Sequence, residues 1–84
     1  MSPILHVRIV NDGGREVADV DAESTLDALA YWLSTNRARH ANPVRHSEAE
    51  LYLIIGQAHA GPGGRVGLTA AQPVEYAGYR AEVR

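Results

Sequence analysis

"ILHVRIVNDGGREVADVDAE", residues 4–23, decides the first half of the fold. Apolar and polar residues alternate on both sides of a glycine-rich centre, which is typical of two half-buried strands joined by a tight turn. We therefore predict a β-hairpin over this stretch. Its register depends on where the turn is centred, because a slip of one residue reverses the face of every side chain.

Two turn positions compete for this hairpin. A turn centred on Asp12-Gly13 would place apolar Ile9 opposite Glu16. A turn centred on Gly13-Gly14 gives opposite-charge or apolar pairs along the whole hairpin, and such cross-strand pairs stabilise a sheet. These pairs are His6–Asp21, Val7–Val20, Arg8–Asp19, Ile9–Ala18 and Val10–Val17. We predict the second turn, with a core face formed by Leu5, Val7, Ile9, Ala18, Val20 and Ala22.

A helix is predicted to follow the hairpin. Ser24 is a typical N-cap residue and Asp27 stands three residues later, as in an acidic form of the capping box. Apolar residues then recur with helical spacing at Leu26, Leu29, Ala30 and Leu33, with Trp32 beside them. Pro43 cannot continue a helix, so residues 41–47 are expected to form a loop.

The second half of the chain carries three further apolar segments. "AELYLIIGQ", residues 49–57, has apolar residues on both faces when it is extended, which favours a buried central strand. "RVGLTA", 65–70, and "VEYAGYRAEV", 74–83, are predicted as two more strands, with Gly67 and Gly78 marking bulges or bends. The expected fold is one α+β domain over residues 1–84, in the order ββαβββ. A single helix packs on a mainly antiparallel sheet of four to five strands.

Composition excludes several classes of chemistry. The 84 residues contain no cysteine, which excludes disulfides, thiolate nucleophiles and cysteine-bound zinc. Lysine is also absent, which excludes Schiff-base catalysis and a Walker phosphate loop. The chain shows neither a signal-peptide pattern nor an apolar run of about 20 residues. We therefore expect a cytoplasmic protein that needs no membrane, metal or cofactor.

"NRARHANPVRH", residues 36–46, concentrates cations in a chain of net charge −2. One interpretation is a helix end, because Arg37 and Arg39 would complement the negative end of the helix dipole. The other is a phosphate site, in which Arg37, Arg39 and Arg45 bind nucleic acid through arginine forks. The acidic balance and the lack of a second basic patch favour the helix end.

The catalytic hypotheses are weaker. His6 beside Asp21 resembles a base with an orienting carboxylate, but no nucleophile accompanies the pair. "GPGGRVG", residues 61–67, lacks both the glycine spacing and the following helix of a phosphate-binding loop. We expect a protein without enzymatic activity. The alternative is a small enzyme whose site forms across a dimer interface, with His6, His40 or His59 as the base.

The leading hypothesis is a protein-binding module of the adaptor or inhibitor type, of the kind that phage or mobile elements encode. One helix covers roughly two or three strands. A larger sheet would leave apolar residues exposed, and such a face usually marks an interface with a partner or a second copy. Alternatively, a strongly twisted sheet curls around the helix and closes the gap. The surplus apolar residues would be Ile4, Val10, Val17, Tyr52, Ile54, Val74 and Tyr76. The predicted binding residues are Arg37, Arg39, His40, Arg45, His46, Arg65, Tyr52 and Tyr76.

Overall fold

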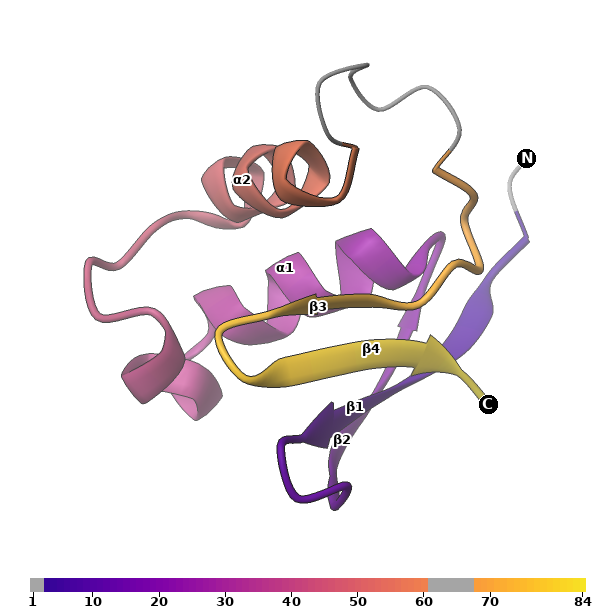
Figure 1. Cartoon of the computed structure of the whole chain (residues 1–84), viewed down its shortest axis with the longest axis horizontal. Coiled ribbons are helices and arrows are strands. Elements are labelled where there is room, and N and C mark those ends of the chain that lie inside the picture. Colours follow the sequence, from indigo (N-terminus) through magenta and orange to yellow (C-terminus); the bar gives the residue numbers. More distant parts are fainter. Residues whose placement is uncertain (1–2, 61–67) are drawn as a thin grey trace.

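The computed structural model describes residues 3–60 and 68–84 and shows an α+β fold (Figure 1). The elements are β1 (Leu5–Asn11), β2 (Glu16–Ala22), α1 (Thr25–Ser34), the 3-10 helix η1 (Asn36–Ala41), α2 (Glu48–Ala60), β3 (Val74–Tyr76) and β4 (Tyr79–Val83). The strands form one antiparallel sheet in the order β2-β1-β4-β3. The predicted fold class and four-stranded sheet are confirmed, whereas three of the predicted elements, over 49–57, 65–70 and 74–83, are different.

The first hairpin has the predicted register over most of its length. His6 pairs with Asp21 and Arg8 pairs with Asp19, but a bulge after Ile9 places Val10 opposite Glu16 instead of Val17. The Asn11 side chain accepts hydrogen bonds from the Gly13 and Arg15 amides, each at 3.0 Å. Gly14 has the positive φ of +82°, which the glycine-rich turn requires.

Helix α1 begins as predicted but ends early. The Ser24 hydroxyl accepts the Asp27 amide at 3.0 Å and also donates to the Asp27 carboxylate. The chain becomes extended at Thr35, and η1 then starts a separate turn whose Ala38 is buried. The basic residues of the segment 36–46 therefore lie outside α1, so the dipole of α1 does not explain why arginines are concentrated there.

Residues 48–60 form a helix, so the predicted central strand over 49–57 is wrong. Ser47 and Glu50 exchange bonds between their side chains and amides, closing the first turn of α2. Leu51 and Ile55, four residues apart, are buried against the rest of the core, whereas Leu53 is 49% exposed. Only one face of α2 therefore packs against the core. The apolar residues that predicted a strand also occupy the other faces of the helix, where Leu53 is exposed.

The predicted strand over 74–83 is a hairpin. Ala77 and Gly78 both have positive φ, 54° and 85°, and form a two-residue turn between β3 and β4. Gly78 is therefore a turn residue and not a bulge. The predicted strand over 65–70 is not found in its described residues, because residues 68–70 do not belong to the sheet. The other residues of that prediction, including Gly67, lie outside the described residues.

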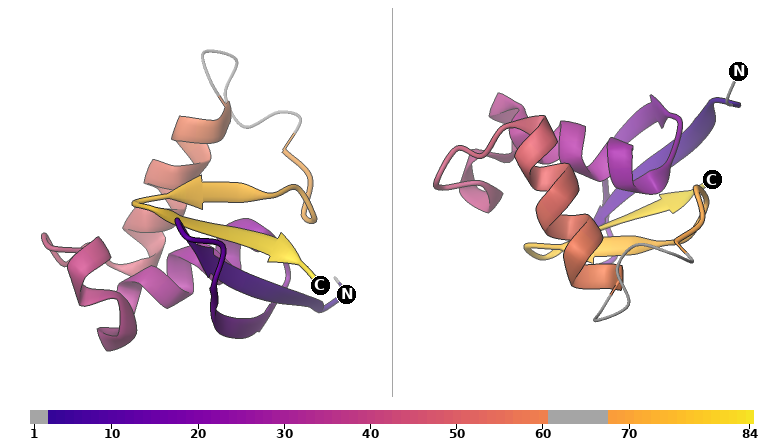
Figure 2. Two further views of the ribbon diagram at one scale, coloured as in Figure 1. Left: turned by 60° about the horizontal axis from the view of Figure 1, so that its bottom comes forward. Right: turned by 90° about the horizontal axis from the view of Figure 1, so that it is seen from above.

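Both helices lie on one side of the sheet, with α1 against the strands and α2 beside α1 and β3 (Figure 2). Apolar side chains of the strands point toward α1. The largest fully buried side chains are Ile9, Leu29, Leu33, Leu51, Ile55 and Val7.

Most of the expected surplus apolar residues are covered in the described part of the chain. Tyr52 and Ile54 belong to α2, Val10 and Val74 are 9% and 2% exposed, and Tyr76 packs against the core. Only Ile4 and Val17 of this set are exposed, at 58% and 39%. With part of the expected sheet replaced by α2, α1 covers all four strands.

Candidate functional site

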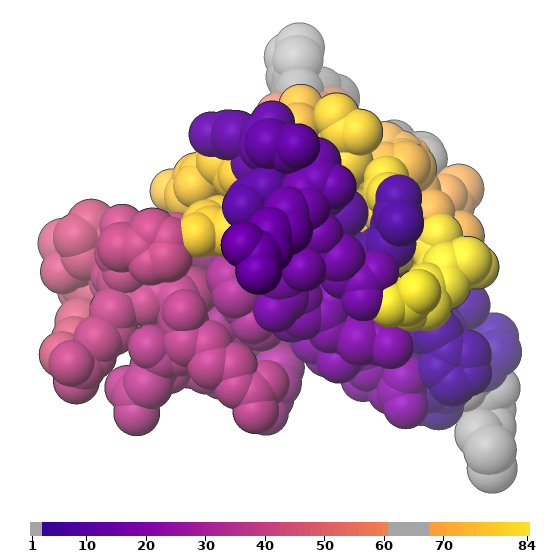
Figure 3. All heavy atoms as spheres, turned by 90° about the horizontal axis from the view of Figure 1, so that it is seen from below, coloured from indigo at the N-terminus to yellow at the C-terminus, as the bar shows by residue number. Residues whose placement is uncertain are grey.

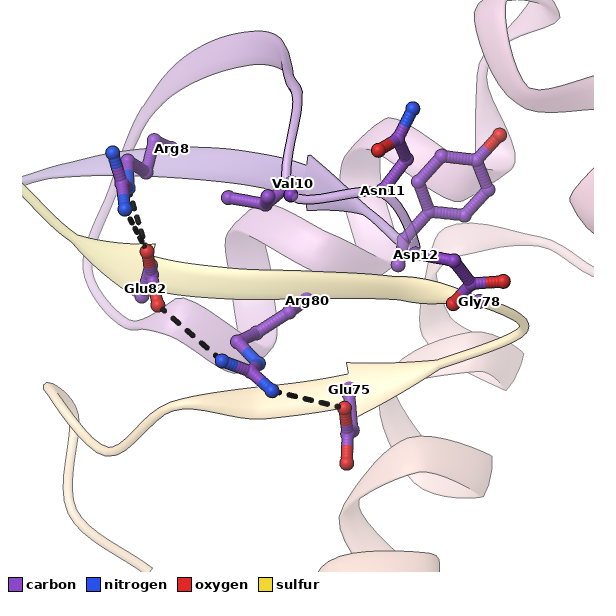
Figure 4. Close-up of a pocket in the computed structure, with 10 residues that line it drawn as sticks. Arg8, Val10, Asn11, Asp12, Glu75, Gly78, Arg80 and Glu82 are labelled. Carbon is purple, nitrogen blue, oxygen red and sulfur yellow. Dashed lines mark hydrogen bonds and ion pairs between the residues drawn. The ribbon is translucent and has the colours of Figure 1, made fainter.

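The open face of the sheet, opposite α1, carries a network of paired charges (Figure 4). The Arg8 guanidinium donates to Glu82 at 2.6 Å, and Arg80 lies 3.7 Å from Glu75 and 4.0 Å from Glu82. These residues line a shallow hollow over β1, β4 and β3. Because each guanidinium faces a carboxylate, the hollow offers little unbalanced charge to a ligand.

The two edges of the sheet differ. At the β3 edge, the Glu75 amide donates to His59 Nε2 of α2 at 3.0 Å, and the Glu75 carbonyl lies 2.8 Å from the same nitrogen. Nε2 accepts from the amide in the Nδ1–H tautomer and donates to the carbonyl when it carries the hydrogen, so the ring bonds to Glu75 in either tautomer. At the other edge, no described strand pairs with the outer side of β2.

A groove of about 560 Å³ runs beside the open edge of β2. Its wall on the sheet side is residues 19–23, and its opposite wall comes from α1, η1 and the start of α2. Five carboxylates and one guanidinium line it: Asp19, Asp21, Glu23, Asp27, Glu48 and Arg37. The exposed ring of Tyr31 completes the groove. We name this surface the acidic edge groove.

The basic stretch does not form one cationic surface. Arg37 lines the acidic edge groove, whereas Arg39 and Arg45 line a separate hollow between η1 and the start of α2. His40 is hydrogen-bonded to the Tyr79 hydroxyl, and Tyr79 packs edge-on against Trp32 at 4.8 Å. Figure 3 shows the pink atoms of this stretch as a lobe beside the indigo hairpin.

Of the remaining predicted binding residues that the structure describes, only His46 lines the same hollow as Arg39 and Arg45. Tyr52 and Tyr76 are half-buried and pack against the hydrophobic core, since they lie on α2 and β3. His46 is half-buried, with Nδ1 3.2 Å from the Glu50 carboxylate. Arg65 lies outside the described residues. The structure therefore groups Arg39, Arg45 and His46 and separates the rest.

Glu50 has an electrostatic role at the start of α2. The Ser47 amide donates to its carboxylate at 3.1 Å, and this bond is the main reason that the pKa of Glu50 lies below its usual value. The His46 and Ser47 side chains lower the pKa of Glu50 further. The ionised carboxylate is thus part of the cap.

A partial signal for the acidic edge groove is visible in the amino-acid sequence. Acids alternate with apolar residues along β2, a pattern that indicates one solvated face. It does not show whether the strand is central or at an edge, and the contributions of Asp27 and Glu48 come from other elements. Only the strand order and the helix placement bring these carboxylates together.

His6 and Asp21 form the predicted contact at 2.8 Å, but both side chains are largely exposed. Within residues 3–60 and 68–84, no group of three histidine or acidic side chains is placed to hold a metal ion. No helix in these ranges is long and apolar enough to cross a membrane.

Protein-family models, curated proteins and solved structures give no match to the chain.

Proposed function

We propose that this chain is a non-catalytic protein-binding module that receives an extended, basic segment of a partner protein along the open edge of β2. The observation that carries the proposal is the contrast between the two sheet edges. His59 and α2 occupy the β3 edge, whereas no described strand pairs with the outer side of β2, which borders the acidic edge groove.

An unpaired edge supplies the backbone groups for strand addition. A peptide laid beside β2 would gain main-chain hydrogen bonds, and its alternate side chains would point into the groove. β2 has 7 residues, a length of about 23 Å at roughly 3.3 Å per residue. It is therefore long enough to pair with a strand of ordinary length.

Charge determines which segment fits. Lysine or arginine side chains at alternate positions would meet the groove's carboxylates, of which Glu23 and Glu48 have no cationic partner within 4 Å in the described structure. The Tyr31 ring, 45% exposed, offers a face for a cation–π contact. Steering by these charges would mainly raise the association rate.

A second copy of the chain is a poor occupant of this edge. Antiparallel pairing of β2 with itself would bring two acidic edge grooves together, each lined by five carboxylates and one guanidinium, and like charges opposite one another destabilise a strand pair. The proposed partner is therefore a different protein. A homodimer was the expectation for a sheet with a surplus apolar face.

The test uses a fluorescent ten-residue peptide of alternating valine and arginine, titrated with the full chain in an anisotropy assay. We expect saturable binding that weakens several-fold in the variant Glu23→Gln/Glu48→Gln. The matched control Asp12→Asn/Glu75→Gln removes two carboxylates elsewhere and is expected to leave the affinity within about twofold. NMR shifts should centre on residues 16–23.

A second peptide, N-methylated at alternate residues, tests strand addition separately from charge. Methylation removes the amide donors but keeps every arginine, so the peptide should bind at least tenfold more weakly if it pairs with β2. Equal affinity of the two peptides would contradict strand addition. Equal loss in the groove variant and the control variant would contradict the site.

A further inference from the structure

The loop hollow, the space between η1 and the start of α2, differs from the other surface hollows. Arg39, Arg45 and His46 line it together with the polar residues Thr35, Asn36 and Ser47, in a cavity of about 210 Å³. No carboxylate is among its lining residues, whereas each of the other described hollows includes at least one. The wall of the loop hollow thus combines positive charge with hydrogen-bond donors.

The two arginines of this hollow have no acidic partner among the residues that the structure describes. Arg8, Arg80 and Arg84 of the sheet each lie within 4.0 Å of a carboxylate. Arg39 and Arg45 make no such pair with any residue in the described ranges, and both are exposed. Their guanidinium groups are free to donate paired hydrogen bonds to an anion.

The backbone that carries Arg45 is held in place. Asn42 is 7% exposed, and its side-chain amide donates to the His46 carbonyl and accepts the His46 amide, each at 2.9 Å. The Arg45 amide also donates to the Asn42 carbonyl at 3.0 Å. Arg45 itself has φ 59°, a left-handed conformation that is uncommon for a residue with a side chain. A fixed loop reduces the ordering cost of binding.

We propose that the loop hollow binds a single phosphate group, as a phosphomonoester dianion, between the guanidinium groups of Arg39 and Arg45. This ligand class matches the geometry of arginine forks. The Glu50 carboxylate contacts two of the hollow's lining residues, the Ser47 amide at 3.1 Å and the His46 ring at 3.2 Å. Its charge is therefore already partly compensated.

A nucleic-acid backbone fits the described surface less well than one isolated phosphate. Polyanion binding needs several cations in a row. Arg37, the third arginine of this stretch, lies in the acidic edge groove, and the sheet arginines are paired with carboxylates. The structure thus offers two free guanidinium groups at one hollow and no continuous basic track within the described residues.

The test is an NMR titration of the full chain with inorganic phosphate at constant ionic strength, with sodium chloride as the reference salt. We expect saturating shifts in residues 34–47. Arg39→Gln and Arg45→Gln should each raise the dissociation constant about tenfold, since each removes a charge-assisted pair of hydrogen bonds. Arg39→Lys keeps the charge without the fork and should fall between wild type and Arg39→Gln.

The control variants are Arg15→Gln and Arg37→Gln, which remove the same charge outside the hollow and should change the constant by less than twofold. Equal weakening in these controls, or identical shifts with chloride, would overturn the proposal. So would tight, Arg37-dependent binding of a twelve-nucleotide RNA without saturation by phosphate. Titration with a capped phosphoserine peptide distinguishes the source: tighter binding than inorganic phosphate indicates a phosphorylated protein, and equal binding indicates free phosphate.

Discussion

Gly14 carries the conformational demand of the first hairpin. Its φ of +82° belongs to the left-handed region, and nothing lies within 4 Å of the place that a Cβ would occupy. A side chain at this position would strain the backbone but would not clash with any neighbouring atom. We expect Gly14→Ala to lower the free energy of unfolding by about 1 kcal/mol, as measured by urea denaturation.

Gly13→Ala is the matched control for the turn. Its Cβ would lie 3.5 Å from the Asn11 side-chain oxygen, an ordinary contact, and its φ is not in the left-handed region. The unfolding free energy should change by less than about 0.5 kcal/mol. A larger loss at Gly13 than at Gly14 would contradict the turn geometry.

Glu50 makes the cap of α2 sensitive to acid. Its pKa is lowered in the folded chain, first by the bond from the Ser47 amide, so its stabilising contribution is present above the usual carboxyl pKa. That contribution is lost as the pH falls through the lower, folded-state pKa. Urea denaturation between pH 6 and about pH 3 should therefore show a smaller acid-induced loss in Glu50→Gln than in wild type.

Glu48→Gln provides the comparison for this pH experiment. Glu48 lies in the same turn and is exposed, but it does not accept the Ser47 amide. The Glu48→Gln variant should lose stability in acid as wild type does. If Glu50→Gln and wild type gave the same pH dependence, the bond to Ser47 would have no role in stability.

At the scale of elements, α2 stabilises the β3 edge through one side chain. Removing the ring in His59→Ala leaves the Glu75 amide with water as its partner. A hydrogen bond contributes about 1 kcal/mol, so we expect hydrogen exchange at that amide to be about fivefold faster by NMR. Gln57→Ala, an exposed change on the same helix, should leave the exchange rate unchanged. Equal rates in all three proteins would show that α2 does not protect this edge.

The elements that sequence reasoning predicted correctly depend on local rules. The first hairpin has charge pairs such as Arg8–Asp19 that only one register satisfies, and α1 has a strong N-cap in Ser24. Both signals lie within a few residues of the structure they determine. The end of α1 was harder to predict, because Thr35 turns the chain well before Pro43.

Two of the wrong elements show where local pattern fails. Residues 51–55 are apolar on every face, so their pattern does not distinguish a buried strand from a helix. Packing of this segment against α1 favours the helix. A signal was nevertheless present, since Ser47 and Glu50 have the spacing of a capping box. Ala77-Gly78 is a weaker turn signal than Asn-Gly, which explains the missed hairpin.

At the scale of the molecule, charged residues of the sheet oppose self-association through its open face and through the β2 edge. The open face of the sheet carries paired charges, and β2 carries acids that would oppose a second copy. We expect sedimentation equilibrium at 100 μM to give the mass of one chain, 9.1 kDa. A dimer that persists in Glu23→Gln/Glu48→Gln would show that another surface joins two copies.

The candidate sites follow from tertiary structure more than from sequence. The clustering of arginine in residues 36–46 was visible, but its division between two hollows was not. That division depends on η1, whose buried Ala38 holds Arg37 and Arg39 on different sides. The acidic edge groove likewise requires knowing that β2 is an outer strand.

The strand order has a consequence for biosynthesis. β4 lies between β1 and β3, and its Val83 pairs with Val7, more than seventy residues earlier in the chain. On the ribosome, the first hairpin and α1 are therefore synthesised before β4, which is a central strand of the sheet. Closing so long a loop is entropically slow. Nascent chains that stop before residue 79 would expose the β1 edge, and a chaperone would find its binding surface there.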